Sequence, residues 1–218
     1  MTKGDLFALM LSFLYVAAIV LFAFFAYWRL KWKGESVRKL IHILTSCWVF
    51  ILIYAMESPF CMMLGPVLFI FINGFFVYGG YGVLLGMGNR KRDNGLVYYP
   101  ISLLILVILY WQSVISSGAV VTGVLVMGWG DGLAALVGSK WGRHRYKVYH
   151  RWEKSAEGSL AMVIVSFMIA IIFGGLSPLS ALFLALVATA LESLTPLGFD
   201  NITVPLLTSL LTEVLCLL

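Results

Sequence analysis

Apolar runs without charge dominate this sequence, and several are long enough to cross a lipid bilayer. A spanning helix needs about 20 largely apolar residues, and the runs at 6–28 and 58–89 reach that length. Only 11% of the residues are charged, whereas ordinary globular proteins have about 25%. The chain is therefore predicted to be an all-α integral membrane protein with one membrane-embedded domain over residues 1–218.

Turn signals divide the apolar runs into about 7-8 transmembrane helices in a polytopic bundle. The run at 94–130 is too long for one helix and divides near QSVISSG, and the run at 158–191 divides at GGLSP. The last run is short and is interrupted by Glu213. The expected spans are 6–28, 40–56, 58–89, 96–111, 118–131, two within 158–191, and 202–218.

Basic residues are distributed unevenly between the loops that join these segments. Of the 15 Lys and Arg residues, 14 fall in loops that alternating topology places on one side, and only Lys3 falls on the other. Because cytoplasmic loops carry an excess of Lys and Arg, that side is expected to face the cytoplasm, with the N-terminus outside. Every loop rich in charge or glycine then opens to the compartment that holds nucleotides.

Asp131 stands alone as a charge in the apolar segment GWGDGLAALVG. A carboxylate inside a membrane segment is costly and is a functional hypothesis by default. Gly128, Gly130 and Gly132 remove side chains around it, so that a ligand or metal ion can approach the backbone. Alternatively, Gly128 and Gly132 have GxxxG spacing and let two helices pack closely. That alternative explains the glycines and leaves the carboxylate unexplained.

The sequence KSAEGS follows a basic loop and opens the next apolar run. Lys154, hydroxyl groups and the free N–H groups of a helix start suit an anionic phosphate. The alternative is a plain helix cap formed by Ser155 and Glu157. His42, one turn into the second span, is either a functional residue or a hydrogen-bonded packing residue.

Common nucleotide and hydrolase motifs are absent from the sequence. It contains no GxxxxGK[ST], no GxGxxG after a strand, no HExxH and no GxSxG. A nucleotide would therefore be bound by other means, and no nucleic-acid partner is expected. The expected partners are the lipid bilayer, a lipid substrate and a nucleotide, and a homo-oligomer is left open.

Four motifs in a fixed order resemble the phytol kinase and dolichol kinase family. They are RKLIHI, GWGDGLAALVGSKWGRH, KSAEGS and ESLTPLGFDNITVPL, and they extend from Arg38 to Pro205. The agreement looks closest with the phytol kinase branch. The resemblance implies a membrane-embedded kinase that takes a phosphate from CTP, uses Mg²⁺ and phosphorylates phytol, geranylgeraniol or a polyprenol at the cytoplasmic face.

The resemblance also assigns roles by position. Asp131 corresponds to the acidic residue of the GD motif and is implied to bind nucleotide-bound Mg²⁺. The implied metal ligands are Asp131, Glu157, Glu192, Asp200 and Asn201. The predicted nucleotide- and phosphate-binding residues are Gly130, Gly132, Gly138, Gly142, Arg143, Ser155, Gly158, Ser159, Arg38 and Lys39. We infer that the catalytic residues are Asp131, Lys154, Glu157 and His42, and either a carboxylate or His42 would take the alcohol proton.

Two other functions remain as alternatives at this stage. The chain also resembles phosphatidate cytidylyltransferases, which share a GD-x-x-A-x-x-x-G segment and a Lys-x-x-Glu-Gly-Ser loop, but it lacks their C-terminal D-R-x-D signature. From another class, an ion-coupled transporter would use intramembrane acids to bind ions. We find no convincing internal repeat of the kind that transporters show.

Overall fold

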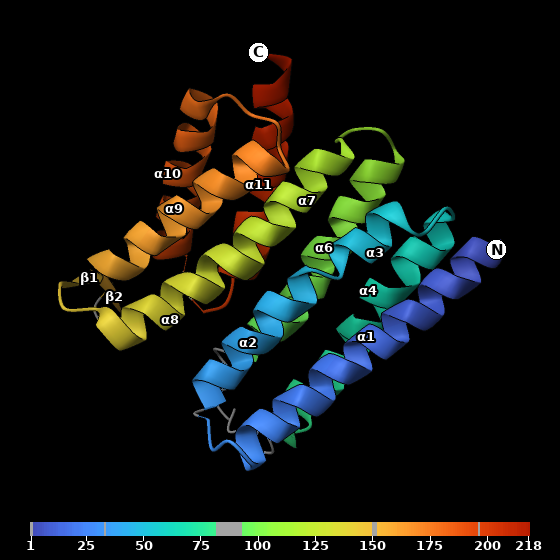
Figure 1. Cartoon of the computed structure of the whole chain (residues 1–218), viewed down its shortest axis with the longest axis horizontal. Coiled ribbons are helices and arrows are strands. Elements are labelled where there is room, and N and C mark those ends of the chain that lie inside the picture. Colours follow the sequence, from blue (N-terminus) through green and yellow to red (C-terminus); the bar gives the residue numbers. More distant parts are fainter. Residues whose placement is uncertain (1, 33, 82–92, 150–151, 196) are drawn as a thin grey trace.

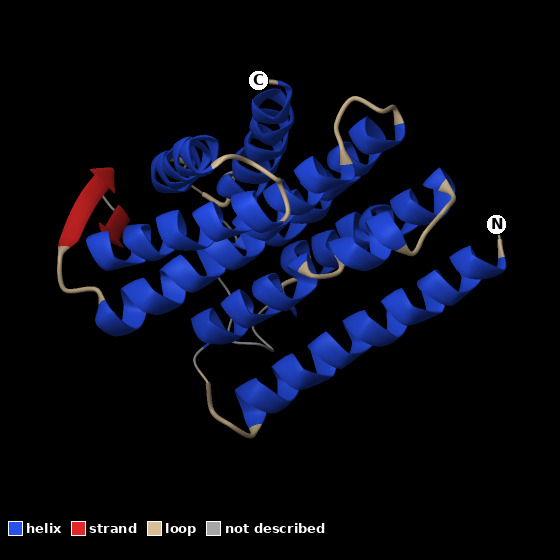
Figure 2. Ribbon diagram, turned by 45° about the horizontal axis from the view of Figure 1, so that its top comes forward, coloured by secondary structure: helices blue, strands red, loops and turns tan. Residues whose placement is uncertain are grey.

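The computed structural model describes residues 2–32, 34–81, 93–149, 152–195 and 197–218. The predicted basic positions Lys33, Arg90, Lys91, Arg92 and Arg151 lie outside the described residues, as do Met1 and most of the glycine-rich tail after Gly79. The described residues form the predicted all-α membrane-type bundle, to which one small hairpin that was not predicted is added (Figure 2).

The helices follow the predicted order of spans. They are α1 (Lys3–Trp28), α2 (Gly34–Ser46), α3 (Val49–Tyr54), α4 (Pro59–Tyr78), α6 (Gly95–Trp111), α7 (Ser117–Leu125), the π-helical turn η2 (Val126–Asp131), α8 (Gly132–Trp141), α9 (Ala156–Ile172), α10 (Pro178–Leu194) and α11 (Asp200–Leu217). The strands β1 (Arg145–Tyr149) and β2 (Trp152–Ser155) form an antiparallel hairpin between α8 and α9.

Five helical segments of the described chain are long and apolar enough to span a membrane, and three shorter apolar helices accompany them. The long segments are 3–28, 34–54, 59–78, 117–141 and 200–217. The shorter helices α6, α9 and α10 have 17 residues each, or about 26 Å at 1.5 Å per residue. These lengths and compositions fit a multi-pass membrane protein.

Serine residues begin three of these helices, because each hydroxyl accepts a hydrogen bond from a free N–H of the first turn. Ser116 caps α7, Ser155 caps α9 and Ser177 caps α10. The caps fall where the predicted loops QSVISSG, KSAEGS and GGLSP interrupt the apolar runs. Local sequence therefore determines where these helices start.

The long helical segment formed by α7, η2 and α8 runs through the bundle (Figure 1). α2 packs against η2 and α8, α9 packs against η2 and α8, and α11 packs against α6 and α7. The α1–α2 loop, the hairpin and the α10–α11 turn lie at one end of the bundle, and both labelled termini lie toward the other (Figure 1). These three segments were predicted to share one side, and the fourth such loop, at 90–92, lies outside the described residues.

Candidate active site

Asp131 is buried at the end of η2 and points at two residues of α2. The carboxylate is 4% exposed, and its Oδ2 lies 2.5 Å from Lys39 Nζ and 4.0 Å from His42 Nε2. Lys39 is 7% exposed. A buried π-helical turn is rare and often marks a functional site, and here it is the turn that ends at the central carboxylate.

Close helix packing brings Lys39 to Asp131. A Cβ added to Gly128 would lie 2.1 Å from the Ser46 Cβ, and one added to Gly132 would lie 2.4 Å from Ile43 Cγ1. The GxxxG reading therefore describes the packing of α2 against η2 and α8. It does not compete with a role for Asp131, because this packing forms the Lys39–Asp131 pair.

Gly130 and Gly132 face packed side chains of neighbouring helices. A Cβ on Gly130 would meet Met162 Sδ at 2.6 Å, and neither glycine lines the cavity described below. Gly132 faces Ile43 instead. Both glycines thus serve close helix packing here.

Lys154 is the penultimate residue of the hairpin strand β2 and pairs with Glu192 near the end of α10. Glu192 is 4% exposed, whereas the Lys154 side chain retains 29% exposure. Burial lowers the pKa of Lys154, but the Glu192 carboxylate raises it, and the net pKa lies above its ordinary value. Lys154 is thus a protonated cation at neutral pH.

The KSAEGS segment forms both a helix cap and one wall of a cavity. Ser155 Oγ accepts a hydrogen bond from Gly158 N at 3.1 Å, which confirms the cap. A Cβ on Gly158 would lie 2.8 Å from the Ala134 carbonyl oxygen, and one on Gly138 would lie 2.8 Å from Ser155 Oγ. These two glycines let α8 and α9 approach closely.

Glu157 turns away from this cavity. Its Oε1 lies 2.8 Å from His144 Nδ1 and accepts a hydrogen bond from His144 N at 3.1 Å. Glu157, Gly142 and Arg143 are not among the cavity's lining residues. The Glu157 carboxylate therefore does not join Asp131 in the cavity, because it is hydrogen-bonded to His144 in the loop between α8 and β1.

Asp200 and Asn201 stand at the first turn of α11. Asp200 Oδ1 accepts hydrogen bonds from Asn201 N at 3.1 Å and Asn201 Nδ2 at 3.0 Å. Asn201 is buried against Gly95, where an added Cβ would lie 2.7 Å from Asn201 Nδ2. Among the described residues, Asp200 makes no ion pair within 4 Å.

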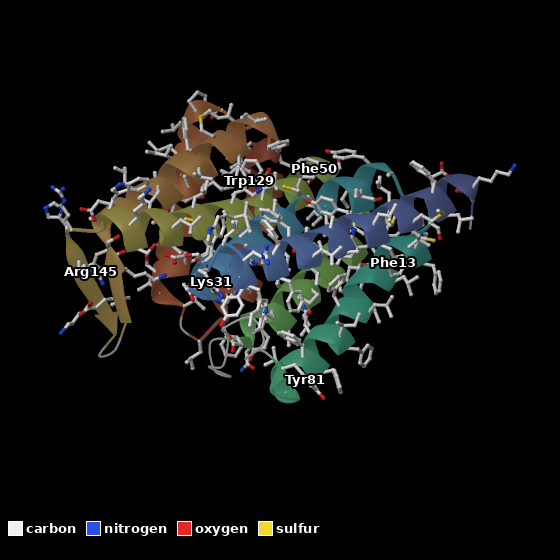
Figure 3. The ribbon with its side chains drawn as sticks, turned by 60° about the horizontal axis from the view of Figure 1, so that its bottom comes forward. Phe13, Lys31, Phe50, Tyr81, Trp129 and Arg145 are labelled. Carbon is white, nitrogen blue, oxygen red and sulfur yellow. The ribbon has the colours of Figure 1, made fainter. Side chains whose placement is uncertain are left out.

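These groups line a single cavity of about 410 Å³ at the loop-rich end of the bundle. Its walls come from α2, α6, η2, α8, the hairpin, α9, α10, the α10–α11 turn and α11. The sequence-predicted residues that line it are Arg38, Lys39, His42, Asp131, Gly138, Lys154, Ser155, Gly158, Ser159, Glu192, Asp200 and Asn201. Figure 3 shows Arg145 on the hairpin at this end, with Phe13 on α1 toward the other end.

Each basic residue that lines the cavity has its own carboxylate. Besides the two lysine pairs, Arg38 Nη2 lies 2.8 Å from Glu35 Oε1, and Arg145 Nη1 lies 3.7 Å from Glu153 Oε2. The cavity lining thus holds four basic side chains and five carboxylates, since Asp200 also belongs to it. In this part of the described chain the charges nearly cancel one another.

His42 contributes a buried polar atom that has no hydrogen-bond partner. Its Nε2 is buried and has no hydrogen-bond partner in the structure, while its ring packs edge-on against Tyr99 at 4.8 Å between centroids. Buried polar atoms are nearly always hydrogen-bonded, so the packing interpretation of His42 is incomplete. A ligand hydroxyl in the cavity would satisfy this nitrogen.

Oxygen donors around the cavity fit a hard cation that also binds phosphate. Asp131, Glu192 and Asp200 supply carboxylates from three helices. In the described part of the chain, no three His, Cys, Asp or Glu side chains are close enough to hold a metal ion by themselves. Mg²⁺ is usually bound through one or two carboxylates and substrate phosphates, so this donor set fits nucleotide-bound Mg²⁺.

Sequence reasoning missed the hairpin and the residues it brings to the cavity. Tyr146 Oη lies 2.6 Å from Ser159 Oγ and 3.3 Å from Ser193 Oγ, so the hairpin is tied to α9 and α10. The lining residues Glu35, Arg145, Glu153 and Ser193 were also missed. The alternation of Tyr146 and Val148 with basic residues was the available strand signal.

Comparison with known proteins supports the motifs. The chain is 42% identical over 123 residues to a phytol kinase of Synechocystis sp., covering 53% of this chain and 52% of that protein. It is 35% identical over 92 residues to a dolichol kinase of Saccharomyces cerevisiae, covering 38% of this chain and 17% of that protein. The resemblance to phytol and dolichol kinases is confirmed.

The chain spans about half the length of the phytol kinase that it matches and a smaller share of the dolichol kinase. No protein-family model and no solved structure matches the chain. The comparisons therefore show a resemblance to lipid-alcohol kinases over part of their length, and the activity of this chain, its donor, its metal and its acceptor are matters for proposal.

Proposed function

We propose that this protein is a CTP-dependent kinase that phosphorylates a membrane isoprenoid or other lipid alcohol, with Mg²⁺ bound to the nucleotide. The observation that carries the proposal is the cavity in which Asp131, Glu192 and Asp200 meet Lys39, Lys154 and Arg38. Phosphoryl transfer requires positioned cations and metal-binding carboxylates more than any covalent chemistry by the protein. The two similar proteins are named phytol kinase and dolichol kinase, which agrees with phosphoryl transfer to a lipid alcohol.

Basic side chains of the cavity would hold the phosphates of the nucleotide. Lys154 on β2 and Lys39 on α2 supply ammonium groups to the cavity lining. Arg38 and Arg145 supply guanidinium groups. Asp131, Glu192 and Asp200 would hold the metal ion, which when bound neutralises charge on the transferred phosphate. Glu157, paired with His144, is left out of this set.

His42 is the residue proposed to accept the proton of the alcohol. His42 lines the cavity, and its buried Nε2 has no hydrogen-bond partner and lies 4.0 Å from Asp131 Oδ2, whereas Asp131 and Glu192 are already paired with lysines. In the reaction, the alcohol oxygen forms a bond to the terminal phosphorus and the bond to the leaving CDP oxygen breaks. The hydroxyl proton moves to His42, and the products are a lipid phosphate and CDP.

The membrane setting supports a lipid acceptor. Apolar side chains such as Phe13, Leu14, Phe71 and Phe75 are exposed along the outer helices α1 and α4, as expected of surfaces that face acyl chains. The described basic segments, the α1–α2 loop and the hairpin, lie at the cavity end, and their excess of Lys and Arg favours a cytoplasmic orientation. The alcohol head would reach the cavity while its tail stays in the bilayer.

Position-specific labelling of CTP tests the proposal and separates it from the cytidylyltransferase alternative. Purified protein is given phytol, geranylgeraniol, a longer polyprenol or phosphatidate with CTP labelled at the γ- or α-phosphate. The proposal predicts γ-label in an alcohol-derived lipid, release of CDP and dependence on Mg²⁺. Incorporation of α-label into lipid with release of pyrophosphate would overturn it in favour of CDP-lipid synthesis.

A further inference from the structure

The Lys39–Asp131 and Lys154–Glu192 pairs join the groups that the proposed ligands would bind. Three of the four partners are less than 10% exposed, and only Lys154 retains moderate exposure. The same lysines are proposed to bind phosphate, and the same carboxylates to bind Mg²⁺. In the structure each of these lysines is paired with one of these carboxylates.

Separating either pair for one ligand alone is unfavourable. If a metal ion takes Asp131, the Lys39 ammonium remains buried without a counter-ion. If a phosphate binds Lys39, the Asp131 carboxylate remains buried without a counter-ion. Removing one partner of a buried ion pair is strongly destabilising because an uncompensated charge remains.

Both ligands together leave no charge without a partner. We propose that Lys39 and Lys154 are exchange partners, which pair with Asp131 and Glu192 as the structure shows and transfer to phosphate when those carboxylates bind a metal ion. The proposal rests on the function proposed above and describes how that site is regulated. Its consequence is that metal and nucleotide bind cooperatively, since each removes the cost that the other would meet.

The exchange has a reciprocal signature in single variants. Lys39→Met frees Asp131, so Mn²⁺ used as a spectroscopic substitute binds more tightly in the absence of nucleotide. Asp131→Asn frees Lys39, so CTP binds more tightly in the presence of EDTA, although joint binding of metal and CTP is lost. We expect changes of at least about fivefold, the lower range of typical coupling between sites.

Equilibrium binding to the full chain in detergent tests the exchange. Mn²⁺ affinity is measured by electron paramagnetic resonance, and CTP affinity by calorimetry with EDTA, for the wild type and both variants. Lys140→Met is the matched control, because Lys140 lies over the Trp141 ring outside the cavity. It should leave both affinities unchanged.

A second pair of variants keeps the test decisive if a Lys39 or Asp131 variant does not fold. Lys154→Met should strengthen binding of Mn²⁺ alone, and Glu192→Gln should strengthen binding of CTP alone. Unchanged or weaker single-ligand binding in folded variants of both pairs would overturn the exchange. If label transfer from CTP to an alcohol is still observed, the proposed function survives; if the wild type neither binds nor uses CTP with Mg²⁺, the proposed function fails with it.

Discussion

Carboxylates at the two ends of the bundle have different kinds of partner. Toward the end that carries the termini, Asp5 accepts hydrogen bonds from the backbone N–H groups of Thr2, Glu57 and Ser58, at 2.9, 2.9 and 3.0 Å. Glu213 similarly accepts one from Ser116 N at 2.7 Å. At the cavity end, Asp131 and Glu192 pair with lysine side chains.

This difference refines the rule that an acidic residue in a membrane segment indicates function. Asp5 and Glu213 satisfy helix starts and tie neighbouring segments together, so their partners are fixed parts of the backbone. The partners of Asp131 and Glu192 are flexible side chains that line a cavity and are able to change partner. What a carboxylate binds, rather than its burial alone, distinguishes the two classes here.

The largest effect is expected from His42, whose buried Nε2 lacks a partner at the cavity end. His42→Gln should lower kcat by about a hundredfold or more, because general base catalysis typically contributes 10²–10⁴-fold. Nucleotide affinity should remain near that of the wild type. The readout is steady-state transfer of γ-label together with CTP binding.

Ser12 on α1 provides the matched control for His42. Its Oγ is also buried without a partner in the structure but lies outside the cavity. Ser12→Ala should leave turnover unchanged. Turnover of His42→Gln within a few-fold of the wild type would instead assign the proton to another group.

A smaller loss is expected when the packing that forms the Lys39–Asp131 pair is disturbed. Gly128→Ala places a Cβ 2.1 Å from Ser46 Cβ, so α2 must move away. Overpacking of this kind costs about 1–3 kcal/mol, and activity should fall with the melting temperature.

Gly74→Ala in α4 tests whether any added methyl group has this effect. The nearest side-chain atom to its added Cβ is Tyr78 Cδ2, at 4.0 Å, and we expect a melting temperature and turnover close to the wild type. Equal tolerance of alanine at both positions would contradict the close approach of α2 and η2.

The smallest loss concerns the hairpin that carries Lys154 and Arg145. Tyr146 and Lys154 are cross-strand partners, and they contact the consecutive α10 residues Ser193 and Glu192. Tyr146→Phe removes the hydroxyl contacts, and one neutral hydrogen bond is worth about 0.5–1.5 kcal/mol. Nucleotide KM should therefore rise roughly two- to tenfold, with kcat and the lipid KM little changed.

Tyr54 offers the same substitution far from the cavity. It is exposed at the end of α3, and Tyr54→Phe should alter neither KM. A rise in both substrate KM values for Tyr146→Phe, or in neither, would argue against a hairpin that serves the nucleotide side of the site.

Sequence patterns predicted the helices well because local signals define their ends. The division at QSVISSG is realised as α6 ending at Trp111 and α7 starting at Ser117. The predicted end of the fifth span at Asp131 was too early, since the helix continues through η2 and α8 to Trp141. A glycine-rich segment with a charge resembles a helix end, but here the glycines lie within packed helices.

The site was predicted in part, because pairing depends on contacts distant in sequence. The motifs named Asp131, Lys154, Glu192 and Asp200, all of which line the cavity. No local pattern indicates that Lys39 pairs with a residue 92 positions later. Glu157 matches the family motif in sequence, yet its carboxylate is bound by His144 in the adjacent loop.

The most direct test compares removal of both charges of the Lys39–Asp131 pair with removal of the Asp5 charge. Asp131→Asn alone leaves Lys39 buried without a partner, whereas Lys39→Met/Asp131→Asn removes both charges and should largely restore stability, since neutral replacement of a buried pair is often tolerated. Asp5→Asn weakens contacts to three backbone N–H groups and should lower the melting temperature while retaining function in the folded fraction.

The measurement is Mg²⁺-dependent CTP binding and γ-label transfer per folded molecule, with melting temperature recorded alongside. We expect the double variant to be folded and to lose transfer by at least about a hundredfold, because electrostatic stabilisation supplies much of phosphoryl-transfer catalysis. Asp5→Asn should instead lower the melting temperature and keep CTP binding and γ-label transfer per folded molecule near those of the wild type. A folded double variant that binds Mg²⁺ and CTP and turns over like the wild type would contradict the assignment of Asp131 to the active site.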